Sequence, residues 1–147
     1  MPVLTTIGYQ NATPMTLVDA LRFAGVELLI DVRAVAASRR PGFSKRQLAA
    51  GLSEAGIGYV HLRALGTPAD GRAAARAGRH DELRRIYLDH LATPAAQAEL
   101  DALSGMVRQG RRVCLLCLEH EPEHCHRRFV AEAVSARTGA VVNHLRP

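Results

Sequence analysis

The chain has 147 residues, of which 48% are apolar and 22% charged, the composition of a soluble globular protein large enough to bury a core. Its formal net charge of +5 favours anionic partners such as phosphates, nucleotides or nucleic acid. An odd count of three cysteines argues against a disulfide framework, no apolar run approaches the ~20 residues of a membrane span, and the first ten residues lack a signal-peptide pattern. We therefore expect one domain over residues 1–147 of a cytoplasmic protein with no membrane partner.

The N-terminal part of the chain alternates strand and helix patterns. The β-rich run Val3–Gly8 predicts a first strand. Thr13 followed by Pro14 is typical of a helix start, and Gly25 is a typical helix end. The apolar run Val26–Val32 then predicts a second strand.

The middle of the chain continues this alternation and then departs from it. A helix is expected from Ser44 to Gly56, and a third strand over Ile57–Leu62. Glycines and a proline interrupt the segment Leu65–Arg79, which we expect to be mostly loop and a mobile flap.

The C-terminal part returns to regular patterns. Helices are expected over His80–Leu91, Thr93–Gly110 and roughly Glu123–Arg137, with strands over Val113–Leu118 and Ala140–Leu145. Short strands that are apolar on both faces and alternate with helices predict a parallel sheet covered by helices. The expected fold class is therefore α/β, a single Rossmann-like three-layer domain with a mostly parallel sheet of about five strands.

Polar residues stand where the expected strands end. Asp31 and Arg33 close the second strand on one face of the sheet, His61 closes the third, and Glu119 follows the fourth. The carboxyl ends of parallel strands share one edge of the sheet, where ligands of α/β proteins usually bind. The sequence therefore predicts one site at this edge.

The segment after the second strand is rich in groups that bind anions. Asp31 beside Arg33 is typical of an ion pair that orients the guanidinium, while Ser38 and Arg39 add a hydroxyl and further N–H donors. These groups suit a phosphate or a carboxylate. The alternative is a structural ion pair accompanied by solvated arginines.

The turn after the fourth strand carries the most reactive chemistry. Cys125, His126 and Arg127 are expected in the first turn of the following helix, where the helix dipole favours an anion or a thiolate. Cys125 is then the candidate nucleophile, Arg127 the candidate anion clamp, and Glu119 or His126 the candidate acid or base. Alternatively, Cys125 and His126 are buried residues of the core.

Metal and cofactor signals are weaker. Cys114 and Cys117 are three residues apart on a strand, so they point to opposite faces and cannot bind one ion. A set that could still surround zinc or iron is Cys117, Glu119, His124, Cys125 and His126. It offers only one pair of neighbouring ligands, so we expect no metal. P-loop, GxGxxG and GxSxG patterns are absent, and no cofactor is expected.

Five segments together resemble a bacterial and archaeal family known as domain of unknown function 488. They are TIGYQ from Thr6, LLIDVRAVAASRRPGFSK from Leu28, GIGYVHLRALGTP from Gly56, YLDHLATPAAQAEL from Tyr87 and VCLLCLEHEPEHCHRRFVAEAV from Val113. The resemblance spans nearly the whole chain and implies one Rossmann-like α/β domain.

The resemblance also implies a set of recurring polar residues. They are Asp31, Arg33, Ser38, Arg39, His61, Cys117, Glu119, Cys125, His126 and Arg127. Cys117 and His61 are thereby expected to support the site. Members often carry proline at the position of Ala36 and histidine at that of Tyr9, so neither feature transfers to this chain.

Three functions are consistent with these residues. The first is an enzyme acting on a phosphorylated or nucleotide-like anion, by hydrolysis or by group transfer. The second is a non-catalytic module that binds nucleic acid or a nucleotide through Arg72, Arg76, Arg79, Arg84 and Arg85, although aromatic residues for base stacking are few. The third is a redox or metal-dependent protein in which Cys117 and Cys125 meet across the turn. We expect Arg33→Ala and Arg127→Ala each to abolish anion binding without unfolding the protein.

Overall fold

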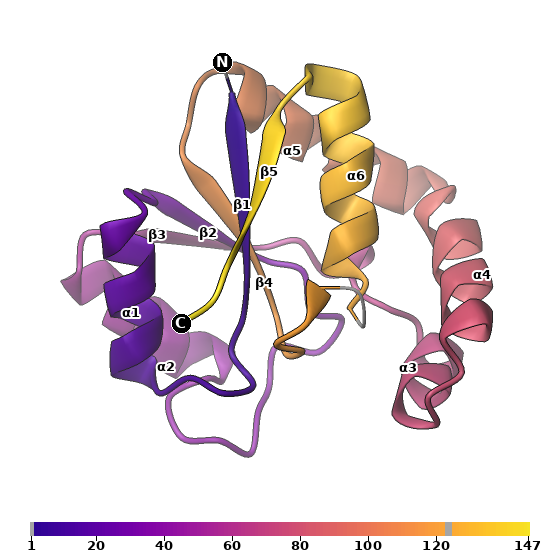
Figure 1. Cartoon of the computed structure of the whole chain (residues 1–147), viewed down its shortest axis with the longest axis horizontal. Helices are drawn as coiled ribbons and strands as arrows, with labels where there is room; N and C mark the ends of the chain where they lie inside the picture. Colours follow the sequence, from indigo (N-terminus) through magenta and orange to yellow (C-terminus); the bar gives the residue numbers. More distant parts are fainter. Residues whose placement is uncertain (1, 123–124) are drawn as a thin grey trace.

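A computed structural model describes residues 2–122 and 125–147, and its centre is a parallel sheet (Figure 1). The strands are β1 (Val3–Gly8), β2 (Leu28–Asp31), β3 (Gly58–His61), β4 (Val113–Cys117) and β5 (Val141–Leu145). They lie in the order β3-β2-β4-β1-β5, and every neighbouring pair is parallel. The expected Rossmann-like α/β class is confirmed, and the sheet is parallel throughout.

Helices cover both faces of this sheet. One face carries α1 (Pro14–Phe23) and α2 (Lys45–Glu54), and the other carries α5 (Pro94–Arg108) and α6 (Arg127–Thr138). Strand residues alternate between the two faces, so the side chains of Leu28 and Ile30 join one core and that of Leu29 the other. A short 3-10 helix, η1 (Arg63–Leu65), follows β3.

Local signals explain where several helices begin and end. Thr13 accepts a hydrogen bond from the N–H of Thr16 in a reciprocal capping box before Pro14. At α5 the Thr93 side chain accepts a single bond from the N–H of Ala96. Gly139 follows α6 with φ of 74°, the left-handed conformation that ends helices. Within the described residues, no helix is both long and apolar enough to cross a membrane.

The expectation of a loop over Leu65–Arg79 is wrong, because it contains the helix α3 (Ala69–Arg76). Helix α3 packs against α4 (His80–Leu91), and Figure 1 shows this pair beyond α6, to one side of the sheet. Gly71 is buried at this contact, where a Cβ would meet Thr67 at 2.6 Å. The glycine therefore permits α3 to pack closely against Thr67, which precedes it, and against α4.

The start expected for the last helix is also wrong. Helix α6 begins at Arg127, so Cys125 and His126 precede it. The turn from Pro122 closes through a bond from the N–H of Cys125 to the Pro122 carbonyl. Glu123 and His124 lie outside the described residues.

The strand register brings the expected edge residues together. Gly8 pairs with Cys117, and Asp31 is in register with both Leu116 and His61. The chain leaves β2 toward the face of α2 and leaves β4 toward the face of α6. Connections that diverge in this way from neighbouring strands open a crevice at the carboxyl edge of a parallel sheet.

Candidate active site

A cavity of about 350 Å³ lies at this crevice. Its walls come from the loop after β2, the turn after β4, and helices α3 and α4. Among the lining residues are Tyr9, Arg33, Val35, Thr67, Arg72, Arg76, Leu83, Cys117, Glu119, Cys125 and His126. The volume is that of a site for a small molecule.

Asp31 and Arg33 form a buried bidentate ion pair in one wall of this cavity. Arg33 Nε donates to Asp31 Oδ1 at 2.9 Å, and Nη2 donates to Oδ2 at 2.7 Å. The remaining Nη1 donates to the Phe43 carbonyl at 2.8 Å and to the Tyr9 hydroxyl at 3.3 Å. Tyr59 donates to the second Asp31 oxygen at 2.5 Å. Arg33 therefore lines the cavity with its donors already engaged.

This network also determines the charge of Arg33. Burial by itself lowers the pKa of a guanidinium, but the hydrogen bonds and charge of Asp31 raise the pKa of Arg33 above its ordinary value. His61 supports the same loop, since its Nε2 lies 2.7 Å from the Arg33 carbonyl. His61 acts on the site through this backbone contact.

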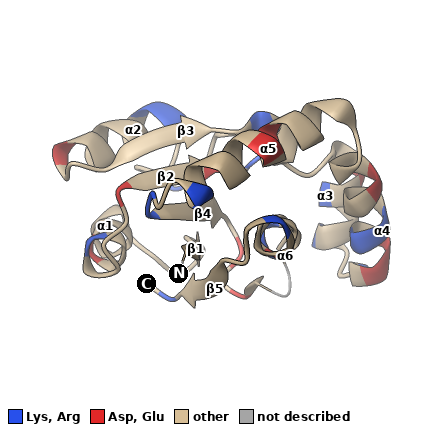
Figure 2. Ribbon diagram, turned by 90° about the horizontal axis from the view of Figure 1, so that it is seen from above, with Lys and Arg blue, Asp and Glu red and all other residues tan. Residues whose placement is uncertain are grey.

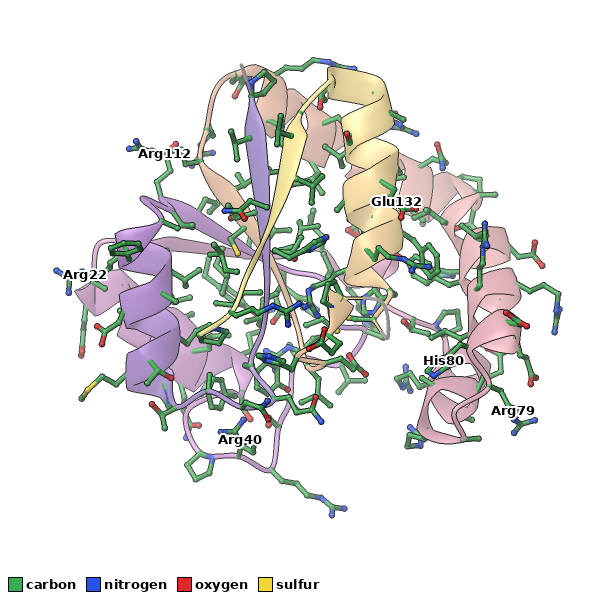
Figure 3. All side chains as sticks on the ribbon, viewed as in Figure 1. Arg22, Arg40, Arg79, His80, Arg112 and Glu132 are labelled. Carbon is green, nitrogen blue, oxygen red and sulfur yellow. The ribbon has the colours of Figure 1, made fainter. Side chains whose placement is uncertain are left out.

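From Ser38 onward, the loop after β2 lies outside the cavity lining. Ser38 makes its hydrogen bonds within the loop. Its Oγ accepts from the N–H of Arg40, and its backbone N–H donates to Ser44 Oγ. Arg39 is exposed, and neither residue is in the cavity lining. Arg40 donates to the carbonyls of Tyr9, Gln10 and Ala12, and Figure 3 shows its side chain at the lower loops of the molecule. Of the two neighbouring arginines, Arg40 therefore binds backbone carbonyls of the protein, whereas Arg39 is exposed.

Arg127 is fully buried and holds the turn after β4 to the end of β1. Its Nη1 donates to the Glu119 carbonyl at 2.5 Å, its Nη2 to the His120 carbonyl at 3.1 Å, and its Nε to Thr6 Oγ1 at 3.3 Å. A Cβ on Gly8 would collide with the Glu119 carbonyl, so glycine is needed at that strand end. Arg127 does not line the cavity, which leaves it a positioning role.

Two sulfurs and an imidazole form a second buried cluster in the cavity lining. Nδ1 of His126 lies 3.6 Å from the Cys117 sulfur and 3.9 Å from the Cys125 sulfur. One ligand atom from each of Cys117, Cys125 and His126 lies within 4.8 Å of the others, so this cluster could hold a metal ion. Glu119 Oε2 is 3.8 Å from the Cys117 sulfur. His124, named with these residues from the sequence, lies outside the described part of the chain.

The cluster separates the acidities of its two thiols. The hydrogen bond with Cys125, together with burial, raises the pKa of Cys117. Burial alone would also raise the pKa of Cys125, but the hydrogen bond from Cys117 and the positive charges of His126 and Arg127 lower it well below its ordinary value. The metal-free cluster thus favours a thiolate at Cys125.

The two proton-carrying groups beside Cys125 respond to its charge. Burial, followed by the negative charge of Cys125, raises the pKa of Glu119 to about 7. Burial lowers the pKa of His126, but the charge and hydrogen bond of Cys125 and the Val32 carbonyl raise it above its ordinary value. Glu119 can therefore take up and release a proton near neutral pH.

The sequence argument missed Arg72 and Arg76 as cavity residues. They are one helical turn apart on α3, and Arg72 Nη1 donates to the Thr67 carbonyl at 2.9 Å. Their spacing of four residues, with alanines between them, is a helix signal that could have revealed their shared face. They bring two guanidiniums to the cavity. The guanidinium of Arg33, which also lines it, is bound to Asp31.

The comparisons with known proteins identify a family. A model of the family described as domain of unknown function DUF488 matches residues 13–134, which confirms the expected resemblance. The matched range contains the loop after β2, the helices α3 and α4, and the turn with the thiol cluster. No curated protein and no solved structure matches the chain.

Proposed function

This chain belongs to the DUF488 family, and we propose that it is an enzyme acting on a small phosphorylated or nucleotide-like anion. One observation carries this proposal: a single cavity is lined both by guanidiniums and by a thiol, an imidazole and a carboxylate. The guanidiniums supply recognition and the cluster supplies chemistry. We also propose a cytoplasmic location, which the three unpaired thiols support.

Arg72 and Arg76 hold the anion in this proposal. Both line the cavity from α3, and Arg76 is exposed, so its guanidinium is accessible to a ligand. Arg33 adds positive charge to the same wall, although Asp31 balances it. Fork-shaped guanidinium groups match the paired oxygens of a phosphate or a carboxylate.

The reacting part of the substrate then lies against Glu119, Cys125 and His126. Such a cluster can react directly through the Cys125 sulfur, with His126 and Glu119 carrying protons, or through a metal ion held by sulfur and nitrogen. Hydrolysis and group transfer both fit these residues. Cys117 and His61 support the cluster and the neighbouring loop.

The cavity favours a small ligand over a nucleic-acid strand. Basic residues on α4 alternate with acidic ones, as Figure 2 shows, and Arg79 at the preceding turn pairs with Glu82 at 3.2 Å. A surface that binds the backbone of a nucleic-acid strand needs a continuous positively charged groove. The extended arginine patch is therefore the weaker candidate for the binding surface.

A thermal-shift screen followed by a turnover assay tests this proposal. The panel contains nucleoside monophosphates, sugar phosphates and short oligonucleotides, each at low and high salt. A small anion at about 100 times its dissociation constant is expected to add about 2.7 kcal/mol of stability. That anion is then followed by mass spectrometry for conversion, which Glu119→Gln should abolish while binding persists. If only oligonucleotides raise the melting temperature, and high salt removes this effect, the protein would be a nucleic-acid-binding module and not this enzyme.

A further inference from the structure

We propose that Cys117, Cys125 and His126 form a binding site for a thiophilic divalent cation, zinc, with a coordination position open to the cavity. The three side chains are 6%, 2% and 6% exposed, and all three line the cavity. The inference deepens the proposed function, on which it rests for the substrate, and it makes Cys125 a ligand of the metal.

The two sulfur–nitrogen distances in the cluster are close to those of a tetrahedral zinc site. Zn–S bonds of ~2.3 Å and Zn–N bonds of ~2.0 Å at the tetrahedral angle put sulfur and nitrogen about 3.6 Å apart. The His126 Nδ1 atom is 3.6 Å from the Cys117 sulfur and 3.9 Å from the Cys125 sulfur. The Cys117 sulfur also lies 4.0 Å from Nε2, so a turn of the Cys117 side chain is needed to bring all three atoms around one ion.

The backbone fixes the tautomer that metal binding needs. His126 Nε2 lies 2.6 Å from the Val32 carbonyl, which only accepts hydrogen bonds, so Nε2 carries the hydrogen. In the neutral ring the lone pair is then on Nδ1, the ring nitrogen nearer to both sulfurs. A backbone carbonyl on the second nitrogen is a usual outer-sphere partner of a metal-bound histidine. Tyr87 packs on the imidazole, with ring centroids 5.2 Å apart, and further fixes its orientation.

The donor set determines the class of metal. Two thiolates and one imidazole favour zinc over the hard cations magnesium and calcium, which prefer oxygen. Two thiolates also balance the charge of a divalent ion, so the occupied site is neutral overall. Neutrality suits a cluster that is almost completely buried.

The remaining coordination position faces the substrate cavity beside Glu119. Three protein ligands with a fourth position open to water are typical of catalytic zinc, and a glutamate outside a Cys-Cys-His set carries protons in zinc-dependent deaminases. In a hydrolytic step, the zinc-bound water gives a proton to Glu119 and its oxygen bonds to the electrophilic atom of the substrate. The bond to the leaving group breaks, and the leaving group takes that proton from Glu119.

Metal titration without any substrate tests this site. Chelator-treated protein is titrated with Zn²⁺ and separately with Co²⁺, whose thiolate charge-transfer and tetrahedral ligand-field absorption report the ligands. One ion per chain is expected, with Mg²⁺ giving no competition. Cys117→Ser and Cys125→Ser should each weaken binding at least ~100-fold and reduce the thiolate absorption.

The matched control is Cys114→Ala. Cys114 is a buried thiol on the same strand, but its side chain lies in the core on the other face of the sheet. This variant should bind zinc with unchanged stoichiometry and spectrum. Circular dichroism of each serine variant checks that the fold persists, and His126→Gln gives an independent loss of the nitrogen ligand.

The outcomes separate this inference from the proposed function. Wild-type protein that binds no Zn²⁺, or Cys117→Ser and Cys125→Ser variants that bind it as tightly as wild type, would overturn the metal site. Zinc binding with the expected ligands supports it whether or not an anion is found. Anion binding weakened by Arg76→Ala supports the substrate assignment whether or not zinc binds.

Discussion

One edge of the Arg33 guanidinium binds both oxygens of the Asp31 carboxylate, with hydrogen bonds of 2.9 and 2.7 Å in a site where Asp31 is fully buried. Further partners of this pair are Tyr59 of β3, the Phe43 carbonyl in the loop before α2, and the Tyr9 hydroxyl. The ion pair therefore fastens the loop after β2, which forms one wall of the cavity. It stabilises the wall and contributes only indirectly to the anion site.

Replacing Arg33 should accordingly reduce stability as well as binding. Arg33→Ala leaves the Asp31 carboxylate buried without its cation, and such a change costs ~3–5 kcal/mol. Urea unfolding should show this loss, and the double variant Asp31→Asn with Arg33→Gln should recover part of it. An Arg33→Ala protein with the stability of the wild type would show that the ion pair does not stabilise the fold.

Arg127 is expected to be structural for the same reason. Arg127→Ala removes the donors to two loop carbonyls and to Thr6, and should lower the free energy of unfolding by at least ~3 kcal/mol. Arg127→Lys should restore only part of this, because an ammonium cannot reproduce the planar fork. A stable Arg127→Ala variant that only loses anion affinity would support the sequence-based expectation of a direct clamp.

Arg76 is the better test of anion recognition. Arg76→Ala should weaken binding of a small phosphate ester ~10–100-fold, because one charge-assisted contact is lost. Arg84→Ala removes the same charge from exposed α4, outside the cavity lining, and is the matched control. Isothermal titration of both variants measures the difference. Equal weakening in the two would indicate a diffuse electrostatic effect.

Glu119 should make stability depend on pH in chelator-treated protein. Its pKa is raised to about 7 from 4.5, so between these values the folded state holds a proton that the unfolded state has lost. The stability that Glu119 contributes is then fully present below about pH 4.5 and is lost as pH rises through 7, by an amount on the order of 3 kcal/mol. Glu119→Gln should reduce this slope in urea unfolding at several pH values. An unchanged slope would assign the titration to another group.

The alternation of short apolar runs with helical patterns was sufficient to predict the fold. The strand over Val3–Gly8 and the helix over His80–Leu91 have the expected bounds, because their ends coincide with local composition changes. Helix α3 escaped prediction because Gly71 resembles a helix breaker. Its reason to be glycine is a close contact with Thr67, which sequence patterns do not reveal.

The sequence predicts at which edge of the sheet the candidate site lies, but not the contacts that its residues make there. Strand ends showed that Asp31, Cys117 and Glu119 would share one edge of the sheet. The role of Arg127 depends on two carbonyls of the turn after β4 and a hydroxyl of β1, so composition could not separate a buried anchor from an anion clamp. Likewise, the orientation of His126 depends on the distant Val32 carbonyl.

Protection of Cys125 from alkylation tests most directly whether the anion and the reactive cluster share one cavity. In chelator-treated protein, iodoacetamide should modify Cys125 faster than Cys114, whose pKa burial raises to about 12. A phosphate ester at about 100 times its dissociation constant should slow this reaction by up to ~100-fold, and Arg76→Ala should reduce the protection to about 2–10-fold at the same concentration. An anion that stabilises the protein yet leaves the alkylation rate of Cys125 unchanged would contradict a shared cavity.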